Sequence, residues 1–214
     1  MKFEEFKKIP RLSRECVITE KLDGTNGQIY IYSYKLYLND YGSEATDSYF
    51  EHLTSEAIEK IENETDKYNP YLIFAGSKSR WLDISSNGDN YGFAKWAKEN
   101  SKELIKLGEG RHYGEWWGSG IQRGYGLPKG EKRFSLFNTH KWSEVRPSCC
   151  HVVPVLYQGM FDTNKINENL LKLVDIGSFA SPRFMNPEGI VIFHQASNYL
   201  FKKTITDDQK GKGE

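Results

Sequence analysis

The chain has 214 residues, a length that suits one large domain or at most two small ones. Lys and Arg together number 29, as do Asp and Glu, so the net charge is zero and no overall positive field indicates a nucleic-acid partner. Three cysteines without regular spacing argue against a disulfide framework, and no apolar stretch approaches the roughly 20 residues of a membrane span. We therefore expect a cytoplasmic protein that does not bind membranes.

The charges are unevenly distributed along the chain. Residues 44–66 are strongly acidic, whereas residues 106–133 contain more bases than acids. A basic binding face and an ordinary solvated surface both explain this pattern. Charge alone therefore leaves nucleic-acid binding open.

The chain is predicted to begin with two strands joined by a tight turn. Residues 16–22 and 28–38 are rich in β-branched and aromatic side chains, and the DGTNG sequence between them is a strong turn signal. Residues 53–67 have apolar side chains at helical spacing, which predicts an amphipathic helix with an acidic outer surface. Residues 71–77 are predicted to form a short buried strand.

A second helix and two more strands are predicted next. Residues 91–108 show helical periodicity and end at a glycine. Residues 111–118 (RHYGEWWG) and 133–138 (RFSLFN) are typical of strands. The glycine-rich segment 118–130 lacks the strand–GxGxxG–helix context of a phosphate-binding loop, so we expect a flexible loop over the site.

The last part of the chain is predicted to combine strands with one helix. Residues 151–157 form a short strand, residues 164–175 a helix, and residues 189–193 and 198–204 a hairpin-like pair. Antiparallel strands with a few inserted helices predict a single α+β domain.

The sharpest local feature is the sequence EKLDGTN at residues 20–26, where a strand meets a tight turn. A lysine at a buried strand end can lose its proton when it is desolvated or lies near other cations, and it then becomes a nucleophile. An exposed lysine beside an Asp-Gly turn explains the same residues. The four-position pattern K-x-D-G, taken alone, favours this second interpretation.

Three distant segments carry further charged residues of matching chemistry. Glu115 lies in HYGEWWG, Glu188 directly precedes the strand GIVIF, and Lys202 and Lys203 lie in LFKKT near the end of the chain. Two carboxylates can bind a divalent cation and a ribose hydroxyl, and two lysines can bind phosphate. Each segment alone is typical of an ordinary surface.

Taken in order, these segments resemble the motifs of the covalent nucleotidyltransferase superfamily, and within it the ATP-dependent RNA ligases of compact phage and bacterial type. The matching residues are Lys21 in K-x-D-G, Arg80 in AGSKSRWL, Gly114-Glu115, Phe137 (rather than Phe134) in RFSLFN, Glu188-Gly189 and Lys202 in LFKKT. Asn26 agrees with the K-x-D/H-G-T/S-N pattern of this branch. The resemblance covers residues 16 to about 204.

The resemblance implies the adenylation-domain fold shared by DNA and RNA ligases and mRNA capping enzymes, with antiparallel sheets and flanking helices. We expect this domain to span residues 1–204 and to be followed by a polar tail, residues 205–214, with no OB domain. One departure concerns the end of the chain, where many relatives have K-x-K. Here Lys202 aligns with the first lysine and Thr204 takes the third place, which leaves the role of Lys203 open.

The resemblance also implies a reaction in three steps. Lys21 attacks the α-phosphorus of ATP to give lysyl-AMP, AMP passes to an RNA 5′-phosphate, and a 3′-hydroxyl displaces AMP to seal the strand. The residues expected to take part in catalysis are Lys21, Asp23, Asn26, Arg80, Glu115, Glu188, Lys202 and Lys203. Those expected to bind the nucleotide are Glu20, Lys21, Gly24, Asn26, Arg80, Glu115, Phe137, Glu188 and Lys202.

The resemblance further implies a divalent cation, Mg²⁺ or Mn²⁺, bound by Glu188 and Glu115. The expected partners are ATP and RNA ends, and we expect a monomer. Two alternatives stay open: another covalent nucleotidyltransferase, such as a DNA nick ligase or a GTP-dependent capping-like enzyme, and a catalytically silent RNA-binding relative. Cys149, Cys150 and His151 lack the C-x₂₋₄-C spacing of structural zinc sites, so we expect no zinc there.

Overall fold

The computed structural model describes residues 2–33, 59–61, 71–84 and 88–206. The chain divides into two compact units. Unit 1 combines residues 1–22 with residues 153–214, and unit 2 comprises residues 23–152. The boundary between Leu22 and Asp23 therefore passes through the K-x-D-G motif.

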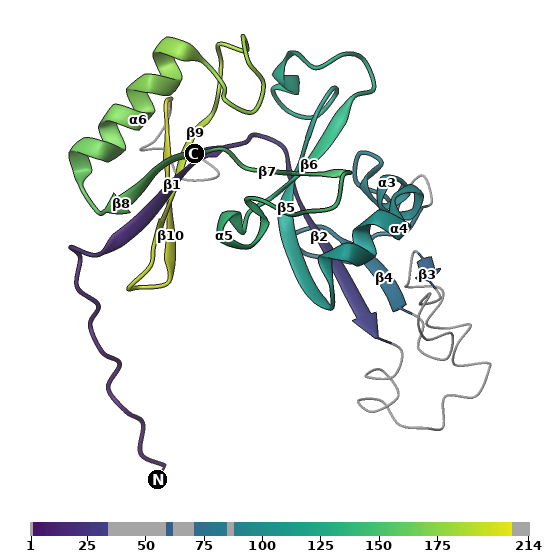
Figure 1. The fold of residues 1–214 in the computed structure, drawn as a ribbon, viewed down its shortest axis with the longest axis horizontal. Coiled ribbons are helices and arrows are strands. Elements are labelled where there is room, and N and C mark those ends of the chain that lie inside the picture. Colours follow the sequence, from purple (N-terminus) through teal and green to yellow (C-terminus); the bar gives the residue numbers. More distant parts are fainter. Residues whose placement is uncertain (1, 34–58, 62–70, 85–87, 207–214) are drawn as a thin grey trace. The chain divides into compact units, whose positions relative to one another are not determined.

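Unit 1 is built on a four-stranded antiparallel sheet with the order β10-β9-β1-β8. Its strands are β1 (Glu15–Lys21), β8 (Val155–Met160), β9 (Gly189–His194) and β10 (Tyr199–Thr204). Helix α6 (Thr163–Ile176) lies along one face of this sheet (Figure 1). The face beneath α6 is the core of the unit.

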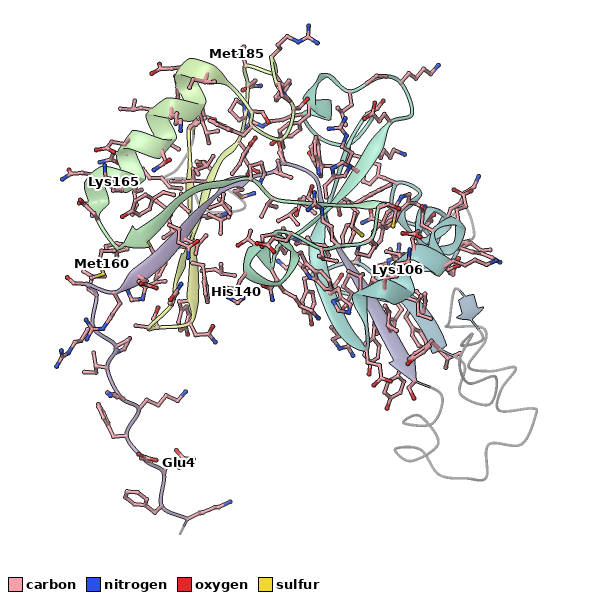
Figure 2. All side chains as sticks on the ribbon, viewed as in Figure 1. Glu4, Lys106, His140, Met160, Lys165 and Met185 are labelled. Carbon is pink, nitrogen blue, oxygen red and sulfur yellow. The ribbon has the colours of Figure 1, made fainter. Side chains whose placement is uncertain are left out.

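Strand β1 shows why the two faces of this sheet differ. Cys16, Ile18 and Glu20 alternate with half-buried residues and are almost completely buried, because they point toward α6. The opposite face carries Lys21. Figure 2 shows Lys165 on α6. Lys165 forms an ion pair with Glu168 on the outer side of the helix.

Unit 2 is built on a six-stranded sheet with the order β3-β4-β2-β5-β6-β7. Its strands are β2 (Thr25–Ser33), β3 (Glu59–Ile61), β4 (Tyr71–Gly76), β5 (Gly110–Gly118), β6 (Lys132–Leu136) and β7 (Cys150–Val152). The pairs are antiparallel except for β6 and β7, which run parallel.

Short helices pack on one face of the larger sheet and close its core. They are α3 (Phe93–Glu99), α4 (Ser101–Leu104) and the 3₁₀ helix η1 (Ile105–Leu107), while α5 (Thr139–Trp142) and the 3₁₀ helix η2 (Gly124–Gly126) lie in the later connections. Phe93 and Leu104 are fully buried against Ile29 and Phe134. Because strand side chains alternate, the other face carries Asn26 and its neighbours at every second position.

The structure confirms the α+β fold with antiparallel sheets and flanking helices. The helix predicted for residues 53–67 is wrong at Glu59–Ile61, which form strand β3 on the edge of β4; the rest of that prediction lies outside the described residues. Pairing with an exposed strand edge outweighed the local helical periodicity.

Two other predicted elements are interrupted. The helix predicted for residues 91–108 breaks at Asn100, whose side chain and backbone N–H both bind the Trp96 carbonyl. The strand predicted for residues 151–157 divides into β7 and β8 around Pro154, which cannot donate to a strand ladder. Among the described residues, no helix is long and apolar enough to cross a membrane.

Candidate active site

Lys21 is the last residue of β1, and strand register brings it next to Glu188. Lys21 pairs with Gly189, so the residue before Gly189 lies beside the lysine side chain. Lys21 Nζ is 2.5 Å from Glu188 Oε2, and the two side chains are 23% and 17% exposed. Gly189 has φ 154°, and a Cβ there would lie 2.2 Å from the Lys203 carbonyl oxygen, so only glycine fits. The E-G motif therefore places a carboxylate on the predicted nucleophile.

The two lysines of β10 face opposite sides of the smaller sheet. Lys202 pairs with Val191, which in turn pairs with Thr19, so Lys202 shares the face that carries Lys21. Lys203 pairs with Ile190 on the α6 face, and its Nζ donates to Asn167 Oδ1 at 3.0 Å. The register thus brings only Lys202 to the face of Lys21.

Glu20 is buried, with 1% exposure, and its carboxylate holds a turn of unit 1. Glu20 Oε1 accepts from Ser178 Oγ at 2.6 Å, and Oε2 accepts from the backbone N–H groups of Phe179 and Ala180 at 2.8 and 3.0 Å. Desolvation raises the pKa of Glu20 and outweighs the lowering by these hydrogen bonds. The Glu20 side chain therefore already has a structural task, and its predicted contact with the nucleotide stays a prediction.

In unit 2, Glu115 on β5 holds the start of β2. Asn26 pairs with Glu115 in the sheet, and its Nδ2 donates to Glu115 Oε2 at 3.2 Å. The backbone N–H of Gly24 donates to Glu115 Oε1 at 3.0 Å. A Cβ at Gly24 would lie 2.4 Å from the Trp116 carbonyl oxygen, so this approach requires glycine. The structure therefore joins three predicted site residues through one carboxylate.

The two phenylalanines of RFSLFN have different environments. Phe134 is fully buried in the core, whereas Phe137 is 42% exposed and follows β6 on the face that carries Glu115. The Phe137 backbone N–H donates to the Tyr113 carbonyl, which places exposed Tyr113 beside it. Tyr113 lies two residues before Glu115 on β5 and therefore shares its face.

Arg80 follows β4 and is exposed. Its Nη1 donates to the carbonyl of Gly88 at 2.6 Å and to that of Trp81 at 3.4 Å. Within the described part of the chain, no hydrogen bond joins Arg80 to another predicted site residue. The role of Arg80 in the site therefore stays a prediction.

The glycine-rich segment 118–130 is packed, in contrast to the expected flexible loop. Ile121 and Tyr125 within it are fully buried. Arg123 Nε donates to Asp23 Oδ2 at 2.9 Å, and Tyr125 Oη accepts from the Asp23 backbone N–H at 2.9 Å. Sequence analysis did not single out Arg123 or Tyr125. The apolar residues within the glycine-rich run indicated packing, but no local pattern indicated a contact with Asp23.

The carboxylates proposed to hold a metal fit a hard divalent cation. Mg²⁺ is usually bound by one or two carboxylates together with substrate phosphates, and Mn²⁺ accepts the same oxygen ligands. Glu188 in unit 1 and Glu115 in unit 2 each supply such oxygens. Among the described residues no group of three or more His, Cys, Asp or Glu side chains could hold a metal ion. By its chemistry each carboxylate suits a metal whose other ligands are phosphate oxygens.

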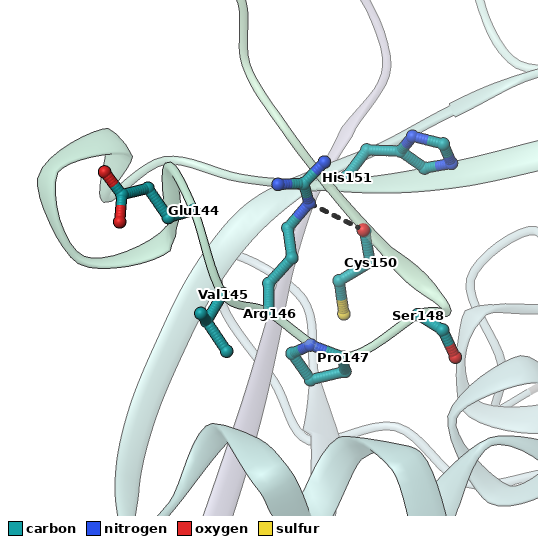
Figure 3. A pocket seen from close by; sticks show the side chains of 7 residues that line it. All are labelled: Glu144, Val145, Arg146, Pro147, Ser148, Cys150 and His151. Atoms are coloured by element: carbon teal, nitrogen blue, oxygen red, sulfur yellow. Dashed lines mark hydrogen bonds between the residues drawn. The ribbon is translucent and has the colours of Figure 1, made fainter.

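A surface hollow of about 380 Å³ lies elsewhere in unit 2, between α5 and β7. It is lined by Glu144, Val145, Arg146, Pro147, Ser148, Cys150 and His151 (Figure 3). Arg146 Nε donates to the Cys150 carbonyl at 3.2 Å (Figure 3). None of the predicted site residues lines this hollow.

Comparison with known proteins gives a family and a fold. The family model described as RNA ligase matches residues 14–204. Among proteins of curated function, none matches the sequence. Solved structures of Naegleria gruberi RNA ligase share the fold: a lysine-to-alanine mutant with ATP and Mn has TM-score 0.54 and 16% identity, and a glutamate-to-alanine mutant with AMP and Mn has TM-score 0.53 and 17% identity.

These alignments cover 90% and 89% of the present chain but only 50% and 49% of the Naegleria chains, so the protein spans about half the length of those relatives. The family match, in contrast, includes all the strands of both sheets and every predicted site residue. The chain therefore belongs to the RNA ligase family.

Proposed function

We propose that the protein is an ATP-dependent RNA ligase that forms a covalent lysyl-AMP intermediate at Lys21. The observation that carries this proposal is the contact between Lys21 and Glu188, which register and Gly189 together impose. Membership of the RNA ligase family supports the reaction class. The Naegleria relatives bound to ATP or AMP with Mn support the choice of nucleotide.

In the first step the Lys21 nitrogen attacks the α-phosphorus of ATP. A P–N bond forms, the bond to the bridging oxygen breaks, and pyrophosphate leaves. The lysine must lose a proton before it attacks, and cations that arrive with the nucleotide would disfavour its protonated form. Glu188 Oε2 accepts a hydrogen bond from Lys21 Nζ and thereby aims the side chain.

Other residues would bind and orient the nucleotide. Glu115 is fixed by Gly24 and Asn26, and because a carboxylate oxygen can accept more than one hydrogen bond, it can also accept from a ribose hydroxyl. Phe137 offers an exposed ring on the same face for stacking with adenine. Lys202, on the face of Lys21, is placed to meet phosphate charge.

A divalent cation would neutralise charge that develops on the phosphoryl oxygens, and Glu188 and Glu115 are each candidates to supply a carboxylate oxygen to it. In the later steps AMP passes to the 5′-phosphate of RNA and a 3′-hydroxyl displaces it. Arg80 is exposed, and its planar guanidinium group suits hydrogen bonding to a phosphate of the RNA end. A monomeric, cytoplasmic enzyme is part of the same proposal.

Labelling with α-³²P-ATP tests the first step. The protein, freed of bound AMP, is incubated with labelled nucleotide and Mg²⁺ or Mn²⁺, beside Lys21→Ala and the matched control Lys95→Ala, whose side chain is 73% exposed on α3. We expect a labelled band on a denaturing gel for the wild type and the control, and none for Lys21→Ala.

Parallel reactions with GTP and NAD separate the other covalent nucleotidyltransferases. Label from GTP alone would indicate a capping-like enzyme, and sealing of DNA nicks but not RNA would indicate a DNA ligase. A wild type that takes label from no nucleotide would overturn the enzyme proposal in favour of an RNA-binding relative.

A further inference from the structure

Asp23, two residues after the proposed nucleophile, is bound from the glycine-rich segment 118–130. Arg123 Nε donates to Asp23 Oδ2 at 2.9 Å, with the two side chains 24% and 26% exposed. The partners are 100 residues apart in the chain, so this contact is purely tertiary. An ion pair that is three-quarters buried and hydrogen-bonded restrains its partners more than a surface pair does.

Tyr125 binds the backbone of the same residue. Its hydroxyl oxygen accepts from the Asp23 N–H at 2.9 Å, and its ring is fully buried with an edge-on contact to Trp117 at 5.0 Å between centroids. Tyr125 has φ 51°, a left-handed conformation that non-glycine residues rarely adopt. Such a conformation persists only where the surrounding structure imposes it.

The segment is tied to the strand that supplies Glu115. Trp117 lies two residues after Glu115 on β5, and its Nε1 donates to Ser135 Oγ at 2.9 Å. Ile121 is fully buried, and its backbone N–H donates to the Gly118 carbonyl. The segment is therefore a rigid extension of β5, and it brings Arg123 and Tyr125 to Asp23 from a fixed base.

The residues that follow Lys21 are consequently held by three contacts. Arg123 binds the Asp23 carboxylate, Tyr125 binds the Asp23 N–H, and Glu115 binds the Gly24 N–H. Only Leu22 separates Lys21 from Asp23, so these contacts fix the backbone that directly follows the proposed nucleophile. Holding reacting groups in place lowers the entropic part of a barrier.

We propose that Arg123 and Tyr125 are positioning residues for adenylylation, which act through Asp23 and touch neither ATP nor RNA. This inference rests on the proposed lysyl-AMP chemistry. Their loss slows formation of the P–N bond at saturating ATP while the affinity for ATP changes little. A segment that served only to complete the fold would lower stability without this kinetic pattern.

The test measures single-turnover lysyl-AMP formation across a range of ATP concentrations. The variants are Arg123→Gln, Arg123→Lys and Tyr125→Phe, of which the last keeps the buried ring. Arg133→Gln is the matched arginine control, because Arg133 pairs with Glu131, which directly precedes β6. Tyr157→Phe is the matched tyrosine control, because its hydroxyl donates to the Met160 carbonyl at the surface.

We expect Arg123→Gln to lower the maximal rate by about 10-fold to 100-fold and Tyr125→Phe by about 3-fold to 10-fold. The half-saturating ATP concentration should change by less than about 2-fold, because the residues act through Asp23. Arg123→Lys should recover part of the rate, and both controls should match the wild type.

A double-mutant cycle gives the decisive arm. When Asp23 is already replaced by Asn, adding Arg123→Gln should lower the maximal rate of lysyl-AMP formation by less than about a further 2-fold, because the partner of Arg123 is already altered. Full additivity, or a wild-type rate in folded Arg123→Gln, overturns the inference while the labelling itself upholds the proposed function. A wild type that takes no label overturns the proposed function and this inference with it.

Discussion

The two units hold their carboxylates in different ways. In unit 1, Glu188 is placed by strand register and bound to Lys21, a side chain that is itself 23% exposed. In unit 2, Glu115 is 8% exposed and accepts from a backbone N–H and from a side-chain amide. An arriving ligand can replace a single ion pair more readily than a pair of fixed contacts. The comparison therefore assigns the adaptable carboxylate to unit 1 and the fixed one to unit 2.

The largest expected effects come from removing each carboxylate. Both Glu188→Ala and Glu115→Ala should lower lysyl-AMP formation by more than about 100-fold, because each removes a proposed ligand of the reacting groups. Glu115→Ala should destabilise the fold more, by roughly 2 kcal/mol, because the half-buried N–H of Gly24 and the amide of Asn26 both lose their acceptor. Glu188→Ala should destabilise the fold less, by about 1 kcal/mol, because the Lys21 side chain is flexible and partly exposed and its ammonium can turn to water.

Labelling kinetics and urea unfolding of the two variants provide the measurements. Glu188→Gln and Glu115→Gln keep the shape of each side chain and serve as controls for packing. Equal losses of stability in the two alanine variants would contradict the distinction between an adaptable and a fixed carboxylate.

The next effect separates the adjacent lysines of β10. Lys202→Ala should slow lysyl-AMP formation by about 10-fold to 100-fold, because its side chain shares the face of Lys21. Lys203→Ala should slow it by less than about 3-fold, because Lys203 binds Asn167 on the other face. Single-turnover labelling of both variants measures the difference. A larger loss for Lys203→Ala would place the phosphate-binding role on the α6 side.

The smallest effect is a difference in pH dependence between the units. Burial raises the pKa of Glu20, so its contribution to stability is fully present below about pH 4.5 and is lost as the pH rises through its folded-state pKa. Burial lowers the pKa of His112, so its contribution is present above about pH 6.5 and is lost as the pH falls through its folded-state pKa. His151 behaves as His112 does.

Melting temperatures of the wild type, Glu20→Gln and His112→Gln between pH 5 and pH 8 measure these slopes. We expect His112→Gln to reduce the loss of stability on acidification, because glutamine can still donate to the Gly108 carbonyl without titrating. The melting temperature of Glu20→Gln should rise relative to that of the wild type as the pH rises. Parallel curves for all three proteins would contradict the assigned directions.

Much of the fold was predictable because its strands are amphipathic over short stretches. Alternation along β1 and β2, and the turn residues between them, correctly predicted two strands. The motif order correctly indicated the RNA ligase family. The helix predicted over Glu59–Ile61 failed because edge pairing with β4 is a long-range effect that a local period does not contain.

In the candidate site, too, local features were predictable and long-range contacts were not. By itself, the sequence determined which residue types the chain offers and where each motif lies, since a motif is a local pattern. The tertiary structure decided which of these side chains meet. Register placed Lys202, but not Lys203, on the face of Lys21, and a loop that packs through Tyr125 brought Arg123 to Asp23. Both outcomes depend on hydrogen bonds and packing between segments far apart in the chain, and no single segment encodes them.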